Sequence, residues 1–258
     1  MKKYGFGADV GGTTIKMGLF EMDGTLVEKW EIPTDTTEKG AHILQDIAAT
    51  VHGKMVENDL TKDMVEGIGI GVPGAVDKDG VVNRAVNLGW DIVPLAEELG
   101  KLSGMKVKVG NDANVAALGE NWMGSGKGYN SIVMVTLGTG IGGGIIIDGN
   151  ILTGANGAAG EIGHIVVNEQ EIEACNCGHY GCIEQYASAT GIVRMAKRAL
   201  AGTSEDSKLR TFGEAVSAKD VFDCARAGDK VACDVVDQVC GMLGATLAKI
   251  GCVVNPDA

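Results

Sequence analysis

The tightest constraint on this chain is a cluster of metal-binding residue types in its second half. Three of the seven cysteines, Cys175, Cys177 and Cys182, fall within eight residues, and His164 stands eleven positions before the first of them. Three thiolates and one imidazole suit a tetrahedral zinc ion and fill its coordination shell. A filled shell leaves no place for a reactive water, so we predict a structural zinc site.

Thiols buried only for packing are the plainer interpretation of this cluster. Gly178 and Gly181 mark tight turns between the cysteines, and packing thiols rarely gather around such turns. The carboxylates of Glu161 and Glu184 flank the predicted ligands on both sides. We therefore expect the metal to hold these two carboxylates in register around a polar ligand.

Composition excludes several classes of protein. The 258 residues have room for one large domain or two modest ones. A net charge of −12 disfavours nucleic-acid binding, because phosphate backbones are bound by clustered Lys and Arg. Residues 1–4 lack the apolar core of a signal peptide, and an odd cysteine count then fits a reducing cytoplasm. The uncharged stretch 131–147 holds five glycines in one run, which predicts two strands around a turn and no membrane span.

A glycine-rich turn lies near the N-terminus. Residues 4–10 and 14–20 alternate as strands do, and the turn between them begins with Gly11 and Gly12. No helix is expected after these glycines, which excludes a Walker loop and a dinucleotide fingerprint, since both need a helix N-terminus there. The backbone amides from Gly11 to Thr14 could still hold a phosphate group.

A second glycine-rich run, at 138–144, lies between two further predicted strands and is expected to form another phosphate loop. Residues 124–128 contain three glycines and predict a connection between two domains, 1–123 and 124–258. Each domain then contributes one glycine hairpin. Two such hairpins in this order are more specific than either one alone.

Helical spacing of apolar residues predicts helices at about 39–57, 217–226 and 230–250. The four cysteines outside the predicted zinc site occur in or beside such apolar helical patterns. They are Cys224, Cys233, Cys240 and Cys252. Because free cysteine behaves as a small apolar residue, we expect all four in the core.

Polar residues follow predicted strands and loops in the first domain. Asn87 ends a loop before Pro94 opens a helix, and its plain interpretation is a turn residue. The strand expected at 105–109 runs into Asn111 and Asp112, where the next helix begins. A carboxylate at such a junction could simply cap the helix. The residues by themselves leave a structural and a functional role open.

Together these motifs resemble the signature of the ROK family, which comprises sugar kinases and sugar-responsive repressors. The resemblance rests on G-E-I-G-H at 160–164 and on C-x-C-G-x-x-G-C-x-E-x-x-A-S at 175–188. The continuation at 186–194 is similar to the bacterial glucokinases of this family. The resemblance runs the length of the chain and implies an α/β protein with the actin-like ATPase (ribonuclease H-like) fold, in which two α/β domains enclose a cleft.

The resemblance implies ATP-dependent phosphorylation of glucose at the 6-hydroxyl group. N-D-A-N at 111–114 is similar to the catalytic motif of the family, which makes Asp112 the general base. His164 can ligate zinc through one nitrogen and donate to the sugar through the other. The residues expected to bind sugar hydroxyls are Asn87, Asn111, Asp112, Glu161, His164 and Glu184.

The family pattern also assigns ATP and Mg²⁺ to the two glycine hairpins. D-V-G-G-T-T-I-K at 9–16 is similar to the first phosphate motif of actin-like ATPases, in which Asp9 faces the magnesium ion through water. The residues expected to contact ATP or its magnesium are Asp9, Gly11, Gly12, Thr13, Thr14, Lys16, Gly138, Thr139, Gly140 and Gly142. The structural zinc is expected at His164, Cys175, Cys177 and Cys182.

Three alternatives stay open within this family. A kinase for fructose, mannose, allose or N-acetylmannosamine would need a different sequence in only one loop of the sugar pocket. A sugar-sensing repressor would carry a helix-turn-helix segment, for which a first strand at about Tyr4 leaves no room. An inactive fragment would bind sugar and zinc alone.

Family members continue beyond the N-P-D at 255–257 with a strand, a G-G motif that cradles the adenine nucleotide, and a helix. Because this sequence stops at Ala258, we expect the C-terminal part to be missing. The resemblance also predicts a homodimer, which we expect in the cytoplasm without nucleic-acid or membrane partners.

Overall fold

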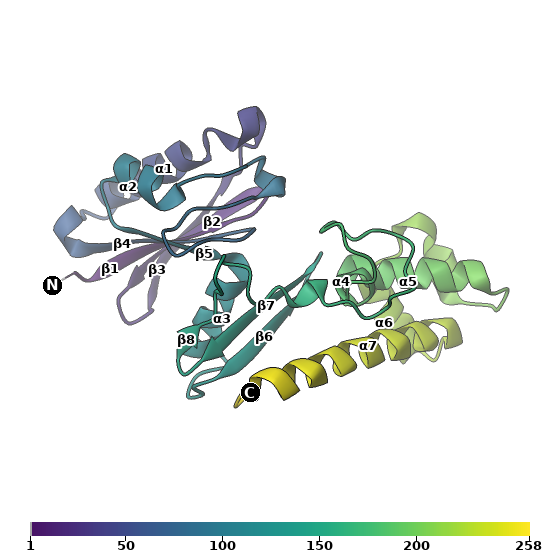
Figure 1. Cartoon of the computed structure of the whole chain (residues 1–258). Helices are drawn as coiled ribbons and strands as arrows, with labels where there is room; N and C mark the ends of the chain where they lie inside the picture. Colours follow the sequence, from purple (N-terminus) through teal and green to yellow (C-terminus); the bar gives the residue numbers. More distant parts are fainter. Residues whose placement is uncertain (1) are drawn as a thin grey trace. The chain divides into compact units, whose positions relative to one another are not determined.

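The computed structural model describes residues 2–258, and their contacts divide the chain into two compact units (Figure 1). The first unit extends to Gly128 and also includes Asn150–Ala159. The second unit consists of Tyr129–Gly149 and Gly160–Ala258. The boundary expected from the glycine-rich connection lies slightly earlier, and the sequence does not predict that the short segment returns to the first unit.

A five-stranded sheet in the order β3-β2-β1-β4-β5 forms the centre of the first unit. β1 is antiparallel to β2 but parallel to β4, and β4 is parallel to β5. Parallel strands end at the same edge, so Asp9 lies beside Gly71, and Val72 beside Asn111. The strands are β1 (Tyr4–Val10), β2 (Thr14–Glu21), β3 (Leu26–Pro33), β4 (Val65–Val72) and β5 (Val107–Asn111).

The core of the first unit lies between this sheet and two helices, α1 (Ile43–Glu57) and α2 (Leu95–Ser103), as Figure 1 shows. Alternate residues of the central strands, such as Phe6 and Ile70, point into this core. α1 buries one stripe of apolar residues, as its spacing predicts. A third helix, α3 (Asp112–Met123), follows β5 directly and contacts β4 and β5.

The second unit begins with the hairpin of β6 (Ile132–Leu137) and β7 (Ile141–Ile147), which confirms two strands around the second glycine turn. Thr136 lies opposite Gly142 in this antiparallel pair. A helical core follows, in which Tyr186 is among the largest fully buried side chains. The α-helices of this unit are α4 (Glu184–Ala187), α5 (Ala189–Gly202), α6 (Ala218–Arg226) and α7 (Lys230–Val254). The short strand β8 (Asn150–Ile151) lies in the segment that belongs to the first unit.

Within residues 2–258, α7 is the one helix long and apolar enough to cross a membrane by length and composition alone. It contacts α4, α5 and α6 in the second unit and buries residues such as Val235 and Val239. The long helices of soluble cores pass the same test. Only 28% of the apolar window of α7 is buried, and a single helix of this kind is weak evidence for a membrane span.

The expectation that four cysteines lie in the core is wrong for two of them. Cys224 on α6 is buried and Cys233 is partly buried, but Cys240 and Cys252 on α7 are exposed. A helix of this length has apolar residues on more than one face, and only the face turned to the other helices is covered. Apolar spacing alone does not show which face that is.

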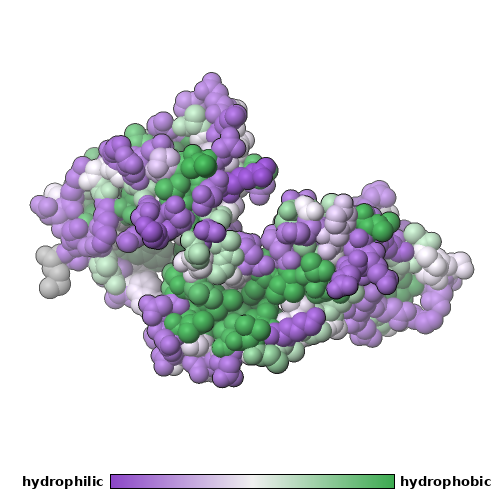
Figure 2. All heavy atoms as spheres, viewed as in Figure 1, coloured by the Kyte–Doolittle hydropathy of each residue, from purple (hydrophilic) through white to green (hydrophobic). Residues whose placement is uncertain are grey.

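Apolar side chains also remain on the surface of the second unit. Figure 2 shows them gathered over the β6–β7 hairpin. Leu137 is 53% exposed and Val253, near the end of α7, is 86% exposed. The apolar core described above therefore covers only part of the apolar surface of this unit.

Two identical substitutions on α1 test the packing of the first unit. Val51 is completely buried, whereas Val56 is 80% exposed on the same helix. Val51→Ala should lower the free energy of unfolding by about 2 kcal/mol, because it removes buried methyl groups and leaves a cavity. Val56→Ala should be neutral or slightly stabilising, since alanine is the better helix former. Urea unfolding of both variants measures the difference, and equal effects would contradict this packing.

Candidate functional site

The predicted first phosphate loop is a tight hairpin between β1 and β2. The Gly11 amide donates to the Thr14 carbonyl at 3.1 Å. Thr34, which follows β3, donates through its hydroxyl to the Gly11 carbonyl at 2.7 Å and through its amide to the Thr13 carbonyl at 2.9 Å. Gly12 and Thr13 at the tip are exposed. The hairpin is thus fixed from behind and open at its tip.

Charged residues stand beside this hairpin on neighbouring strands. Asp9 on β1 pairs in register with Lys16 on β2, and both are exposed. Together with Asn111 they line a cavity of about 790 Å³ in the first unit. A carboxylate suits a hard cation such as Mg²⁺, and an ammonium group suits phosphate.

The structure brings Asn87 to the first hairpin. It lies in a short 3₁₀ helix, Val86–Leu88, that ends at Gly89 in a left-handed conformation with φ 74°. A Cβ placed on Gly12 would lie 3.6 Å from the Cβ of Asn87. A residue predicted to bind sugar and a loop predicted to bind phosphate are therefore neighbours within one unit.

Asn111, and not Asp112, caps helix α3. The Asn111 side chain accepts from the Asn114 amide at 3.1 Å and donates to the Gly74 carbonyl at 3.2 Å. Asp112 accepts from the Ala113 amide at 2.8 Å. The capping role that the sequence left open for Asp112 thus belongs to its neighbour, and the Asp112 carboxylate is held at the first turn of the helix.

The pKa of Asp112 is raised above the ordinary value of an aspartate. Partial desolvation by the surrounding protein is the largest cause, and the Asp9 carboxylate adds to it, while the hydrogen bond from Ala113 opposes both. A pKa raised towards the working pH makes a carboxylate a stronger base. The environment of Asp112 therefore favours proton acceptance.

The predicted second phosphate loop is anchored by Glu184 at the start of α4 and by Thr190 at the start of α5. The Glu184 carboxylate accepts from the Ile141 amide at 2.8 Å, and a Cβ on Gly140 would overlap that carboxylate. The Thr190 hydroxyl donates to the Thr139 carbonyl at 2.7 Å. The sequence predicts Glu184 as a sugar ligand and does not predict Thr190 at all. Since a hydroxyl that supports a loop has no motif of its own, only the structure finds it.

The four predicted zinc ligands come together as expected. The donor atoms of His164, Cys175, Cys177 and Cys182 all lie within 4.8 Å of one another. Cys177 Sγ is 3.6 Å from Cys182 Sγ, and His164 Nδ1 is 3.8 Å from Cys175 Sγ. Zinc bonds of usual length predict edges of about 3.5–3.8 Å in a tetrahedron of such ligands. The cluster therefore fits a zinc ion by ligand type and by size.

Burial makes two of these thiols poor thiolates in the absence of a cation. It raises the pKa of Cys182 to about 12 and also raises the pKa of Cys175. Zinc ligands must be deprotonated, so a bound cation would supply the stabilisation that the protein interior lacks. Glu184 lies beside the cluster, with its Oε1 3.9 Å from Cys175 Sγ.

His164 is oriented with its two nitrogens on different groups. Nδ1 faces the thiol cluster, whereas Nε2 lies 3.9 Å from Glu161 Oε2. The Glu161 carboxylate, a predicted sugar ligand, therefore lies next to the imidazole nitrogen that does not face the thiols. Glu161 itself is exposed. Within this unit, the predicted sugar and zinc residues thus form one continuous group with the second phosphate loop.

Comparison with known proteins gives this arrangement a context. The glucokinase of Halalkalibacterium halodurans is 44% identical over 254 residues, covering 97% of this chain and 77% of the relative. The crystal structure of a ROK family glucokinase from Streptomyces griseus with glucose and AMPPNP has a TM-score of 0.77 at 36% identity, covering 98% of this chain and 80% of that one. A ROK family transcriptional regulator has a TM-score of 0.84 at 28% identity, covering 98% and 63%.

The fold is that of the actin-like ATPases, as the sequence predicts. The model of the ROK family matches residues 5–258, and this chain belongs to that family. The chain spans about four fifths of the length of its glucokinase relatives. Since kinases and a regulator share the fold, the fold alone does not separate catalysis from sensing.

A pair of glycine substitutions tests the geometry of the zinc loop. Gly178 and Gly181 are both left-handed, with φ of 89° and 74°. A Cβ on Gly178 would meet nothing within 4 Å, whereas a Cβ on Gly181 would overlap the carbonyl of Asn168. Both changes to alanine should cost about 1–2 kcal/mol for the left-handed backbone. Gly181→Ala should cost about 1–3 kcal/mol more, from the overlap.

Thermal unfolding and metal retention during dialysis measure this difference. We expect Gly181→Ala to unfold at the lower temperature and to lose metal faster, since its overlap lies directly beside Cys182. If the two variants behaved alike, the close approach of Gly181 to Asn168 would not exist in solution.

Proposed function

We propose that this protein is an ATP-dependent glucokinase, which transfers the γ-phosphoryl group to the 6-hydroxyl of glucose. The carrying observation is the 44% identity to a glucokinase over 97% of the chain. The likeness to a glucokinase bound to glucose and AMPPNP supports it. The transcriptional regulator is less similar in sequence, at 28% identity.

Asp112 serves as the general base in this proposal. Its carboxylate takes the proton of the sugar hydroxyl as the oxygen attacks the γ-phosphorus in line. The bond from the γ-phosphorus to the bridging oxygen breaks, and ADP leaves with that oxygen. Burial and the Asp9 carboxylate raise its pKa, which makes it a stronger proton acceptor. The bond from Ala113 and the cap formed by Asn111 fix its direction.

The two glycine hairpins bind the phosphates of ATP. In the first, exposed Gly12 and Thr13 offer backbone amides, and Lys16 adds a positive charge. In the second, loop 138–144 is held by Glu184 and Thr190. Bound Mg²⁺ would neutralise charge on the phosphates, and the Asp9 carboxylate would hold it through water. Positioning and electrostatics then supply most of the catalysis.

Polar side chains bind the hydroxyl groups of glucose in this proposal. Asn87 and Asn111 contribute from the first unit, and Glu161, His164 and Glu184 from the second. A structural zinc held by His164, Cys175, Cys177 and Cys182 would keep the side chains of Glu161, His164 and Glu184 in place. We further propose that the protein is a cytoplasmic homodimer, and light scattering would test the dimeric state.

Assays with fructose, mannose, allose and N-acetylmannosamine would show whether the enzyme prefers glucose.

Asp112→Asn tests the base. The amide keeps the size of the side chain but cannot accept the proton, so kcat should fall by roughly 10²-fold or more. The KM for glucose should change far less. Asp46→Asn, the same change on the exposed face of α1, is the matched control and should leave kcat unaltered. Wild-type turnover in Asp112→Asn would reduce Asp112 to a structural residue.

The same base sets the acid limb of the pH profile. An aspartate with a raised pKa becomes protonated, and so inactive as a base, at a higher pH than an ordinary aspartate of pKa about 3.9. We expect kcat/KM to fall as the pH drops through this raised value. An acid limb at or below the ordinary aspartate pKa would contradict the environment described for Asp112.

The zinc site predicts metal content directly. Purified protein should contain about one zinc per chain, as a single site of three thiolates and one imidazole implies. Removal of zinc with a chelator should weaken glucose binding, because Glu161 and Glu184 are then released, and readdition should restore it. Metal-free protein with full glucose affinity would rule out this role for zinc.

A further inference from the structure

A buried carboxylate, Glu171, lies in the loop that leads to the zinc cluster. Its side chain is only 1% exposed. Oε1 accepts from the backbone amides of Ile172 and Glu173 at 3.0 and 3.1 Å. No sequence motif marks this residue, and neither the proposed catalysis nor the proposed zinc site uses it.

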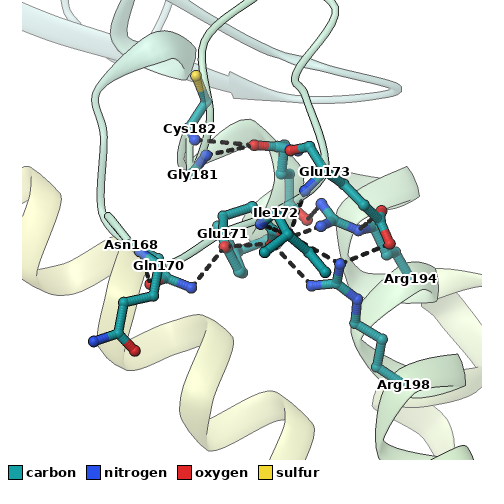
Figure 3. Close-up of polar contacts among 11 residues, drawn as sticks. Asn168, Gln170, Glu171, Ile172, Glu173, Gly181, Cys182, Arg194 and Arg198 are labelled. Carbon is teal, nitrogen blue, oxygen red and sulfur yellow. Dashed lines mark hydrogen bonds and ion pairs between the residues drawn. The ribbon is translucent and has the colours of Figure 1, made fainter.

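Three side chains from two helices converge on this carboxylate, and two of them, Arg194 and Arg198, are labelled in Figure 3. Tyr186 on α4 donates to Oε2 at 2.6 Å. Arg198 on α5 binds both oxygens, at 2.8 and 3.0 Å, and Arg194, one turn earlier, contacts Oε2 at 2.6 Å. The hydrogen bonds from Arg198 and Tyr186, with the charge of Arg194, hold the pKa of Glu171 far below its usual range, so the carboxylate stays ionised. The loop is thereby tied to α4 and α5.

Glu173 adds a second layer to these contacts. Its carboxylate lies 3.0 Å from Arg194 Nε and 2.9 Å from Arg198. The two carboxylates and two guanidinium groups balance in charge, and Figure 3 shows the four side chains in contact with one another. A bidentate guanidinium pair fixes direction as well as distance.

Gln185 extends the contacts to the zinc ligands. Its Oε1 accepts from the amides of Gly181 and Cys182 at 2.9 and 3.1 Å, and its Nε2 donates to the Glu173 carbonyl at 3.0 Å. One amide side chain thus joins the segment before Cys175 to the segment that carries Cys182. Gln185 is also the immediate neighbour of Glu184 at the start of α4.

The position of Glu184 matters for the proposed chemistry. It bonds the second phosphate loop through Ile141 and lies beside Cys175. Binding groups have to be held to within a fraction of an ångström, and this accuracy comes from the residues behind them. A buried ion pair is weak evidence for stability, because apolar packing can serve as well. The charged groups of Glu171, Arg194 and Arg198 add a fixed orientation of the side chains, which apolar packing does not provide.

We propose that Glu171 is a positioning residue for the sugar and zinc sites. With Arg194, Arg198 and Gln185 it forms an anchor that sets the place of Glu184 and of the zinc loop. This inference rests on the proposed glucokinase function and its structural zinc. It predicts that glucose affinity and zinc retention depend on a carboxylate that touches neither glucose nor zinc.

Glu171→Gln is the test, and Glu214→Gln is its matched control. Glu214 also pairs with a cation of α5, Lys197, but is 95% exposed. Glu171→Gln should raise the KM for glucose by roughly 10-fold and speed zinc transfer to a chromogenic chelator by a similar factor, while kcat stays within about 2-fold. Glu214→Gln should match the wild type in all three.

Arg198→Lys is the second variant, in case Glu171→Gln fails to fold. It keeps the charge but loses the bidentate bond, so we expect the same shifts to a smaller degree. The proposal is overturned if a folded Glu171→Gln protein has an unchanged KM and unchanged zinc release, even if its melting temperature is lower. If only Arg198→Lys folds, the same result in that variant overturns the proposal.

The wild-type protein separates this inference from the proposed function. Absence of zinc in it would refute the zinc site and leave the KM measurement to test the anchor. Absence of glucokinase activity would refute the proposed function, and the zinc-release measurement would then test the anchor. Each failure is thus recognisable by itself.

Discussion

The second unit depends on one carboxylate that serves two neighbours. Glu184 accepts the Ile141 amide of the second phosphate loop and lies 3.9 Å from the Cys175 sulfur. Because the same residue begins α4, the loop, the thiol cluster and the helical core are joined at one point. A metal bound by His164 and the three cysteines would therefore act on the loop through a single side chain. This explains physically how a structural metal can affect a site in which it takes no chemical part.

The first unit holds the proposed base, Asp112, at the start of helix α3. The parallel strands β1, β4 and β5 end at one edge and place Asp9 near Asp112. Asn111 takes over the capping of α3, so the Asp112 carboxylate does not have to. Desolvation and the neighbouring negative charge then raise the pKa of Asp112. Two adjacent residues thus divide a structural and a proposed chemical role.

The sequence predicted the elements whose pattern is local. β1, β2, the β6–β7 hairpin, α1 and α3 follow from alternation, glycine turns and helical spacing, and the resemblance gave the family and the fold. β3 went unpredicted because it is an edge strand with charged residues and little burial. The exposure of Cys240 and Cys252 was mistaken because a helix pattern does not reveal which face is covered. The roles of the predicted site residues stay predictions.

By itself the sequence predicted the metal-ligand set and determined the two glycine turns and the family. Each of these needs only residue types at fixed spacing, since ligand chemistry and turn conformation are local properties. The tertiary structure alone decided that Asn111 caps α3, that Asn87 lies beside Gly12, and that Glu171 is buried among Tyr186, Arg194 and Arg198. These depend on groups brought together from distant parts of the chain. Side chains from distant segments become buried and come into contact only when the helices and strands pack against one another.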